Sequence, residues 1–192
     1  MVETTTRNAT DTKKTVNYQV IDNFLDDDSF KVLIDNVMSS KHIWYYGESV
    51  ADESKIESDM YFMNLYYMDA PDELKNKLDQ DTQNTLPIKS DNFSVVKPII
   101  DRIDHNFLLR AKANLYTRTD KIIHHPDHQD YDFTHMGAIF YVNTNDGLTV
   151  LDNEVEIDSV SNRLLVFDGS TMHHSTTCTN QKRRVNINFN FM

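Results

Sequence analysis

The spacing of apolar residues changes along the chain from helical in the first half to alternating in the second. Apolar side chains recur every three or four positions over 28–39, which predicts an amphipathic helix that the aspartates at 26–28 can cap. A second stripe predicts a helix over 91–107, which Pro98 could kink near its start. The rest of this half is predicted to hold strands over 18–25 and 59–68 and a mixture of short helix and loop over 69–90.

After residue 110 the pattern is that of short strands. Runs rich in Val, Ile, Phe and Tyr are separated by polar turns such as Asn145-Asp146-Gly147 and Ser161-Asn162. Eight strands following helices predict a mainly β (α+β) fold, namely a double-stranded β-helix (a jelly-roll or cupin-like barrel) with the N-terminal helices packed on one sheet. The predicted strands cover 110–118, 121–125, 136–144, 148–152, 154–158, 163–169, 173–179 and 183–192.

Length and composition predict one domain. The chain has 192 residues, of which 39% are hydrophobic and 10% aromatic, and this is enough for a single core. Residues 1–16 are polar and threonine-rich, which predicts a flexible leader. The domain is then expected to span 17–192, with its jelly-roll core at about 110–192 and an acidic loop over 51–59.

The charge and the cysteine content narrow the partners and the compartment. Thirty acidic against nineteen basic residues give a net charge of −11, which argues against nonspecific binding to nucleic-acid phosphates. No run approaches the roughly 18 apolar residues of a membrane span, and no apolar signal segment opens the chain. The single Cys178 cannot form an internal disulfide. We therefore expect a soluble cytoplasmic protein with small-molecule partners, whose oligomeric state the sequence leaves open.

Histidines supply the strongest chemical signal. Six of the eight follow residue 123, and His128-Gln129-Asp130 forms a His-x-Asp motif whose two outer side chains point the same way in an extended segment. His173, after the strand predicted over 163–169, could supply a third ligand. Two histidines and one carboxylate that leave the other positions of a metal open form the facial triad of non-haem iron(II) oxygenases. We therefore predict a metal site at His128, Asp130 and His173.

Other residues compete for the same role. His125-Pro126-Asp127 is a second His-x-Asp motif, and His174 adjoins His173. The 128/130 pair is favoured because Pro126 fixes its own φ inside the other motif, and because the pair lies closer to the strand predicted from 136. His173 and His174 would face opposite ways on a strand, so only one of them should bind.

Arg184 follows His173 by 11 residues. If a two-residue turn joined their strands, His173 and Arg184 would lie opposite each other on one face, and Arg183 would point away. A guanidinium in that place could hold a carboxylate through two hydrogen bonds. Polar residues alternate with apolar ones over 184–191, so one face of this strand could line a cavity while the other joins the core.

Four segments resemble the small, prolyl-4-hydroxylase-like branch of the 2-oxoglutarate/Fe(II) oxygenase superfamily. They are HQD (128–130), GAIFYVNTNDGLTVL (137–151), RLLVFDGSTMHHS (163–175) and KRRVNINFNF (182–191). A weaker likeness covers 18–107, where VIDNFLDDDSFKVLI looks like the opening strand and helix of that family. Similar short forms are common in phage genomes, which suggests a phage-encoded protein. The turn in NTNDGLTVL lacks the double glycine usual in prolyl hydroxylases, which argues against a prolyl substrate.

The resemblance implies Fe(II), 2-oxoglutarate and O₂, and a dioxygenase that forms succinate while hydroxylating an unidentified substrate. It assigns the metal to His128, Asp130 and His173 and the far carboxylate of 2-oxoglutarate to Arg184. In that family a strand before the His-x-Asp motif often offers a tyrosine or a similar group to the cosubstrate. Tyr116 and Asn114 hold this place and share a face, although ordinary strand packing explains them equally well.

Residues outside this set leave further alternatives. Trp44, Tyr45 and Tyr46 could form a lid over the barrel or pack into its core, and His124, His125 and Asp127 could rim the entrance. A non-redox metal enzyme or metal-binding cupin would use the same three ligands for zinc or nickel and would leave Arg184 without a cosubstrate. A noncatalytic jelly-roll binding protein would not need the three side chains to converge at all.

Overall fold

The computed structural model describes residues 16–47, 50, 61–77 and 80–192. Residues 1–15 of the expected leader and the loop expected over 51–59 lie outside this part of the chain. The strands are β1 (Tyr18–Ile21), β2 (Tyr45–Gly47), β3 (Tyr61–Met68), β4 (Ile88–Lys89), β5 (Leu108–Thr117), β6 (Met136–Tyr141), β7 (Leu148–Leu151), β8 (Val155–Asp158), β9 (Arg163–Asp168), β10 (His173–Ser175) and β11 (Arg183–Phe191). The helices are α1 (Asp27–Val37), α2 (Asp72–Lys75), α3 (Gln80–Thr85) and α4 (Phe93–Ile100).

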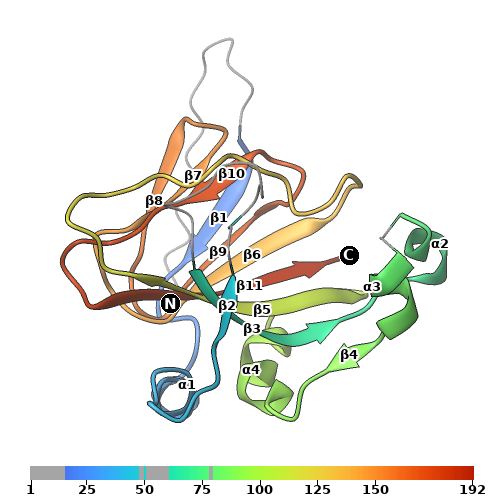
Figure 1. Ribbon diagram of the computed structural model, residues 1–192, viewed down its shortest axis with the longest axis horizontal. Coiled ribbons are helices and arrows are strands. Elements are labelled where there is room, and N and C mark those ends of the chain that lie inside the picture. The colour runs from blue at the N-terminus through green and yellow to red at the C-terminus, as the bar shows by residue number, and fades with distance from the viewer. Residues whose placement is uncertain (1–15, 48–49, 51–60, 78–79) are drawn as a thin grey trace.

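Two antiparallel sheets face each other and enclose the barrel (Figure 1). The large sheet has the order β1-β9-β6-β11-β5-β3-β2, with β4 paired to β3, and the small sheet has the order β10-β7-β8. Helices α1 and α4 lie on the side of the large sheet that faces away from β7, β8 and β10 (Figure 1). The predicted double-stranded β-helix with helices on one sheet is therefore confirmed.

Alternation along the strands separates two cores. Val185, Ile187 and Phe189 of β11 are buried on the outer face of the large sheet, where Leu33 of α1 and Ile99 of α4 join them. Residues of the inner face pack in a smaller cluster between the sheets, made of Ile139, Tyr141, Leu151, Ile157, Leu165 and Phe167. The polar positions of β11 also face inward, so the barrel interior is divided between an apolar cluster and a polar cavity.

Both predicted helices exist, but the second is shorter than its stripe suggested. Helix α1 begins after Asp26, whose carboxylate accepts a hydrogen bond from the backbone N–H of Ser29. Helix α4 ends at Ile100 rather than at 107, and it contains Pro98 in its interior. The chain cannot stay helical as far as Phe107, because the backbone of Phe107 exchanges hydrogen bonds with Met192 at the end of β11.

Two strand predictions after β5 were wrong. Residues 121–125 form no strand, because their backbone bonds to 175–177, such as His125 N–H to Ser175 O, are isolated and do not form a continuous ladder. The strand expected over 173–179 ends at Ser175, where the chain leaves the small sheet and crosses to the large one. No helix among the described residues is long and apolar enough to cross a membrane.

Asn162 ties the N-terminal segment to the barrel. Its side-chain amide donates to Leu25 O and its side-chain oxygen accepts from Leu25 N–H, both at 2.9 Å, in a buried environment. Its backbone carbonyl accepts from Phe24 N–H at 3.0 Å. The φ angle of Asn162 is +60°, a left-handed conformation that asparagine tolerates better than most residues. This one side chain therefore fixes where the segment leading into α1 meets the turn before β9.

We expect Asn162→Ala to lower the free energy of unfolding by about 2–3 kcal/mol, because it leaves two buried backbone groups without partners and places alanine at a positive φ. Asn162→Gly should lose only the hydrogen bonds. Asn153→Ala is the matched control, because Asn153 has a similar φ of +54° but is exposed. Urea denaturation checks this, and equal losses at positions 162 and 153 would contradict the proposed tie.

Candidate metal centre and the adjoining pocket

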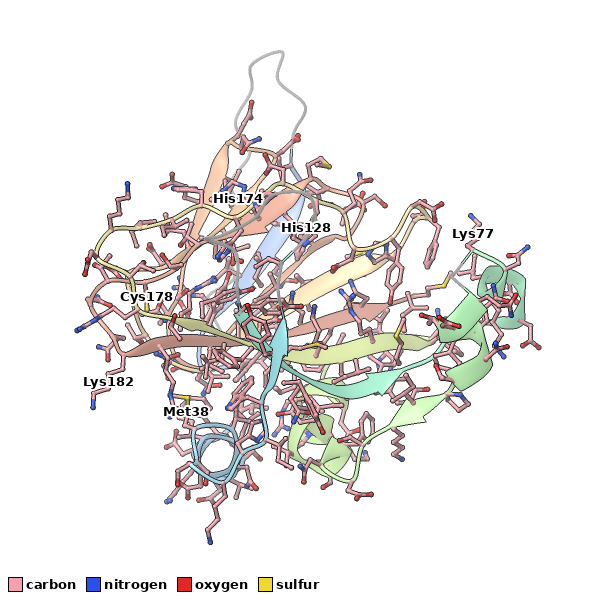
Figure 2. All side chains as sticks on the ribbon, in the orientation of Figure 1. Met38, Lys77, His128, His174, Cys178 and Lys182 are labelled. Carbon is pink, nitrogen blue, oxygen red and sulfur yellow. The ribbon has the colours of Figure 1, made fainter. Side chains whose placement is uncertain are left out.

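The segment between β5 and β6 is held against the edge of the small sheet. The backbone N–H of His128 donates to His173 O at 3.0 Å, and the N–H of His173 donates to His128 O at 2.9 Å. This reciprocal pair places residue 128 directly beside residue 173, although 45 positions of sequence separate them. Figure 2 shows His128 and His174 on the side of the large sheet where β10 lies.

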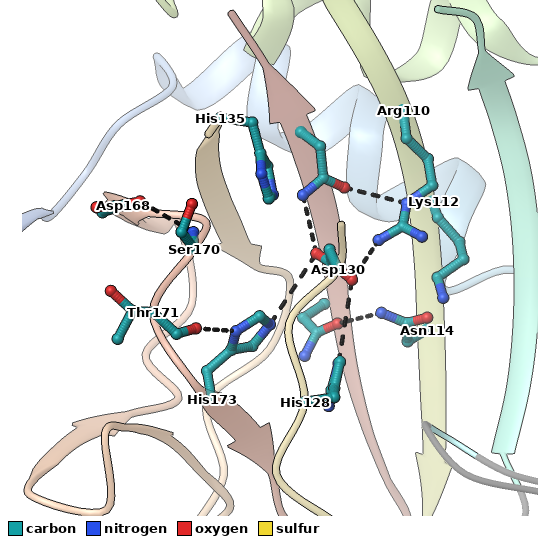
Figure 3. Close-up of polar contacts among 12 residues, drawn as sticks. Arg110, Lys112, Asn114, His128, Asp130, His135, Asp168, Ser170, Thr171 and His173 are labelled. Carbon is teal, nitrogen blue, oxygen red and sulfur yellow. Dashed lines mark hydrogen bonds and ion pairs between the residues drawn. The ribbon is translucent and has the colours of Figure 1, made fainter. Parts of the chain in front are cut away.

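The three predicted ligands converge. Asp130 lies between the two imidazoles (Figure 3), with Oδ1 4.0 Å from His128 Nε2 and Oδ2 4.0 Å from His173 Nε2. The candidate ligand atoms all lie within 4.8 Å of one another. A carboxylate and two imidazoles around one point form a donor set suited to a divalent transition metal.

The hydrogen bonds of the two imidazoles leave the correct nitrogens free. His173 Nδ1 is 2.9 Å from Thr171 O and His128 Nδ1 is 3.2 Å from Pro126 O. Each Nδ1 therefore donates its proton to a backbone carbonyl, which leaves each Nε2, on the side facing Asp130, available to bind a metal. His173 Nε2 is buried without a partner. A metal ion would satisfy this orphaned atom, so the residues present fit the predicted metal.

Asp130 is held by two donors from neighbouring strands. Arg110 of β5 donates to Oδ1 at 2.5 Å, and Asn190 of β11 donates to Oδ2 at 2.8 Å. Arg110 Nε also donates to Asn190 Oδ1 at 3.0 Å, which closes a ring of three side chains. Burial alone would raise the pKa of Asp130, but Arg110, His173 and Asn190 hold it well below its usual range. The carboxylate is therefore ionised and fixed in orientation.

The second His-x-Asp motif is engaged elsewhere. The Asp127 carboxylate lies 2.6 Å from His174 Nδ1, and His174 Nε2 lies 2.9 Å from His124 Nδ1. His125 is buried rather than at the rim, with Nδ1 2.8 Å from Ser175 Oγ and its ring stacked on Tyr116. Burial lowers the pKa of His125 to about 3, so this imidazole is neutral. His124 and Asp127 are exposed and do not line the described pocket.

Arg184 faces the barrel interior, but not for the reason that the sequence suggested. β10 pairs with β7, whereas β11 pairs with β5 and β6, so the predicted hairpin register between His173 and Arg184 is wrong. Arg184 points inward because it occupies an inner position of β11. Arg183 points the other way and donates to Met38 O.

The guanidinium of Arg184 is fully buried and meets only neutral groups. It donates to Ser159 Oγ at 2.9 Å, to Thr149 Oγ1 at 3.1 Å and to Thr176 O at 3.2 Å. The Tyr116 ring lies 5.4 Å from its central carbon. No described carboxylate lies among the groups that raise its pKa, and burial lowers that pKa. Among the described residues, this buried cation therefore has no counterion.

A polar pocket of about 200 Å³ adjoins the metal centre. Its walls include the three predicted ligands, together with Asn114 and Tyr116 from the inner face of β5. Thr149 and Tyr116 also contact Arg184, so the guanidinium lies directly behind that part of the wall. Gly147 packs over the same guanidinium, since a Cβ added there would lie 2.5 Å from Arg184 Cδ. The structure thus brings together all six residues that the sequence singled out.

Sequence reasoning missed two polar residues of this region, Arg110 and Lys112, and it placed Asn190 on the polar face of its strand without predicting its bond to Asp130. Arg110 and Lys112 alternate with alanines in the strand that also carries Asn114 and Tyr116, and this spacing was the available signal. Residues 44–46, for which the sequence left a lid and core packing open, are not part of the described pocket wall. Trp44 packs against the outer core, while Tyr45 and Tyr46 are exposed on edge strand β2.

No protein-family model and no curated protein matches the chain. Solved structures do match. A prolyl hydroxylase from Trichoplax adhaerens, in complex with a hypoxia-inducible-factor peptide fragment, aligns over 93% of this chain and 84% of its own, with 13% identity and a TM-score of 0.58. The epimerase SnoN of nogalamycin biosynthesis, described as non-haem and α-ketoglutarate-dependent, covers 92% and 78%, with 12% identity and a TM-score of 0.56.

A viral collagen prolyl hydroxylase from Paramecium bursaria Chlorella virus-1, in its 2-oxoglutarate complex, covers 90% of this chain and 94% of its own, with 14% identity and a TM-score of 0.51. At these identities the likeness concerns the arrangement of strands and helices. The paired sheets and the outer helices agree with it. The chain therefore shares the double-stranded β-helix fold of these three solved structures.

Proposed function

We propose that the protein is a non-haem Fe(II) dioxygenase that couples conversion of 2-oxoglutarate to succinate with hydroxylation of a further substrate. The observation that carries the proposal is a converging His–Asp–His cluster beside a buried arginine that has no counterion among the described residues. The cluster supplies three ligands for iron, and the arginine calls for an anion.

The ligand arrangement supports a catalytic iron site with open coordination positions rather than a structural metal site whose positions are all occupied by protein ligands. His128, Asp130 and His173 would bind on one side, and the cavity lies on the other, where further ligands could enter. Arg110 and Asn190 would hold Asp130 at its place in this set. Iron(II) with 2-oxoglutarate and O₂ would supply oxidative decarboxylation coupled to oxidation of the substrate.

Arg184 supports 2-oxoglutarate as the cosubstrate. Burying an isolated charge costs on the order of several kcal/mol of folding free energy, unless a partner of opposite charge compensates it. A dicarboxylate that reached from the metal to the wall formed by Thr149 and Tyr116 would bring its far carboxylate close to this guanidinium. A non-redox metal protein has no such requirement, so the buried cation favours the oxygenase over that alternative.

We expect Asp130→Ala to lower Fe(II) affinity at least about 10- to 100-fold and to abolish succinate formation, because it removes the charged ligand and leaves Arg110 unpaired. Asp127→Ala is the matched control, since it disrupts the second His-x-Asp motif and should leave iron affinity within a few-fold. Anaerobic equilibrium dialysis measures the affinity. The reverse order of effects would move the metal to the other motif.

We expect Arg184→Met to raise the KM for 2-oxoglutarate about tenfold or more, because the far carboxylate loses the cation proposed to hold it. The free energy of unfolding should change little, since the lost hydrogen bonds offset the removal of a buried unpaired charge. Arg183→Met on the opposite face of β11 is the control. Succinate release at varied 2-oxoglutarate gives KM, and an unchanged KM together with a large loss of stability would assign Arg184 a structural role.

A further inference from the structure

Lys112 stands apart from the other inward residues of β5. Arg110 binds Asp130, Asn114 donates to Asn186 Oδ1 at 3.1 Å, and Tyr116 covers Arg184. Lys112 lines the same pocket, yet among the described residues its ammonium has one hydrogen-bond partner, the Tyr61 hydroxyl, at the long distance of 3.5 Å. Figure 3 shows Lys112 beside Arg110 and Asn114 without a polar contact to the other residues drawn.

The charges around Lys112 do not balance within the part of the chain that the structure describes. Asp130 is the carboxylate whose charge favours the ammonium, but Arg110 and Asn190 already hold both of its oxygens. Burial, followed by the like charge of Arg110, lowers the pKa of Lys112 to about 7. The ammonium and the neutral amine are therefore close in free energy at neutral pH, and a bound anion would favour the ammonium.

The surroundings of Lys112 select a polar ligand. Asn114 and Asn188 each carry a buried side-chain oxygen without a partner, and both line the pocket. Such atoms call for a hydroxyl, an amine or an amide on the ligand, or for water. Arg184 is separated from this region by the pocket wall, so one dicarboxylate held at Arg184 and at the metal would leave Lys112 free for a second molecule.

Resting on the proposed function, we propose that the primary substrate presents a compact anionic group, a carboxylate or a phosphate, to Lys112 beside the metal centre. The cavity of about 200 Å³ must also hold the cosubstrate, so only a small polar part of the substrate enters. Lys112 then acts as a specificity-determining residue: its ammonium holds the anion, and the anion's position sets which carbon faces the metal.

The test uses the holoenzyme with saturating 2-oxoglutarate and Mn(II) in place of iron, and inorganic phosphate and acetate as probes. Mn(II) shortens the nuclear relaxation times of a nearby phosphorus or carboxyl carbon. We expect saturable relaxation of at least one probe, with an affinity that falls about tenfold or more in Lys112→Met and survives within a few-fold in Lys112→Arg. Lys121→Met, at an exposed lysine, is the matched control.

The outcomes separate this inference from the proposed function. Stronger relaxation of phosphate points to a phosphorylated substrate, and stronger relaxation of acetate points to a carboxylic acid. Absence of saturable relaxation for both probes, or equal relaxation in Lys112→Met, overturns the inference. The visible charge-transfer band of the anaerobic Fe(II) and 2-oxoglutarate complex is recorded for each variant. Its presence keeps the oxygenase proposal intact whatever the probes do, and its absence in the wild type rejects that proposal instead.

Discussion

Strand β11 lies in the middle of the large sheet and is hydrogen-bonded on both sides, to β5 and β6, so its side chains have only two directions available. Its apolar members face α1 and α4, and its arginine and asparagines must then enter the barrel. The polar cavity follows from this constraint. Neither Arg184 nor Asn190 can leave the interior without moving Val185 or Phe191 out of the outer core.

The sequence predicted those features that depend on local spacing. The two-residue step from His128 to Asp130 and the alternation over 184–191 are periodic signals, and both placed side chains on the correct face. The cap of α1 at Asp26 is equally local. Features that depend on where the chain crosses between sheets could not be predicted, because turn residues do not encode such a crossing. The register assumed between His173 and Arg184 failed for this reason.

The same limit explains which site residues were missed. Arg110 and Asp130 meet only because the segment between them returns to β10 through the backbone pair of His128 and His173. In sequence Arg110 is one polar position among several in a strand. The charge distribution of the barrel interior therefore follows from the tertiary structure and not from local spacing. Arg110 and Lys112 share the carboxylate of Asp130, whereas Arg184 has no carboxylate partner among the described residues, although the chain carries a net charge of −11.

The contact between Asp127 and His174 affects which of two neighbouring sets of ligands a metal ion would bind. Asp127 and His174 are adjacent in sequence to the predicted ligands His128 and His173, yet they already form a hydrogen bond with each other. His124 extends this chain of hydrogen bonds to the exposed surface. A cation that bound Asp127 and His174 would first have to break their hydrogen bond, whereas the predicted centre offers His173 Nε2, which has no hydrogen-bond partner. Binding of the metal at the alternative residues is therefore disfavoured relative to binding at His128, Asp130 and His173.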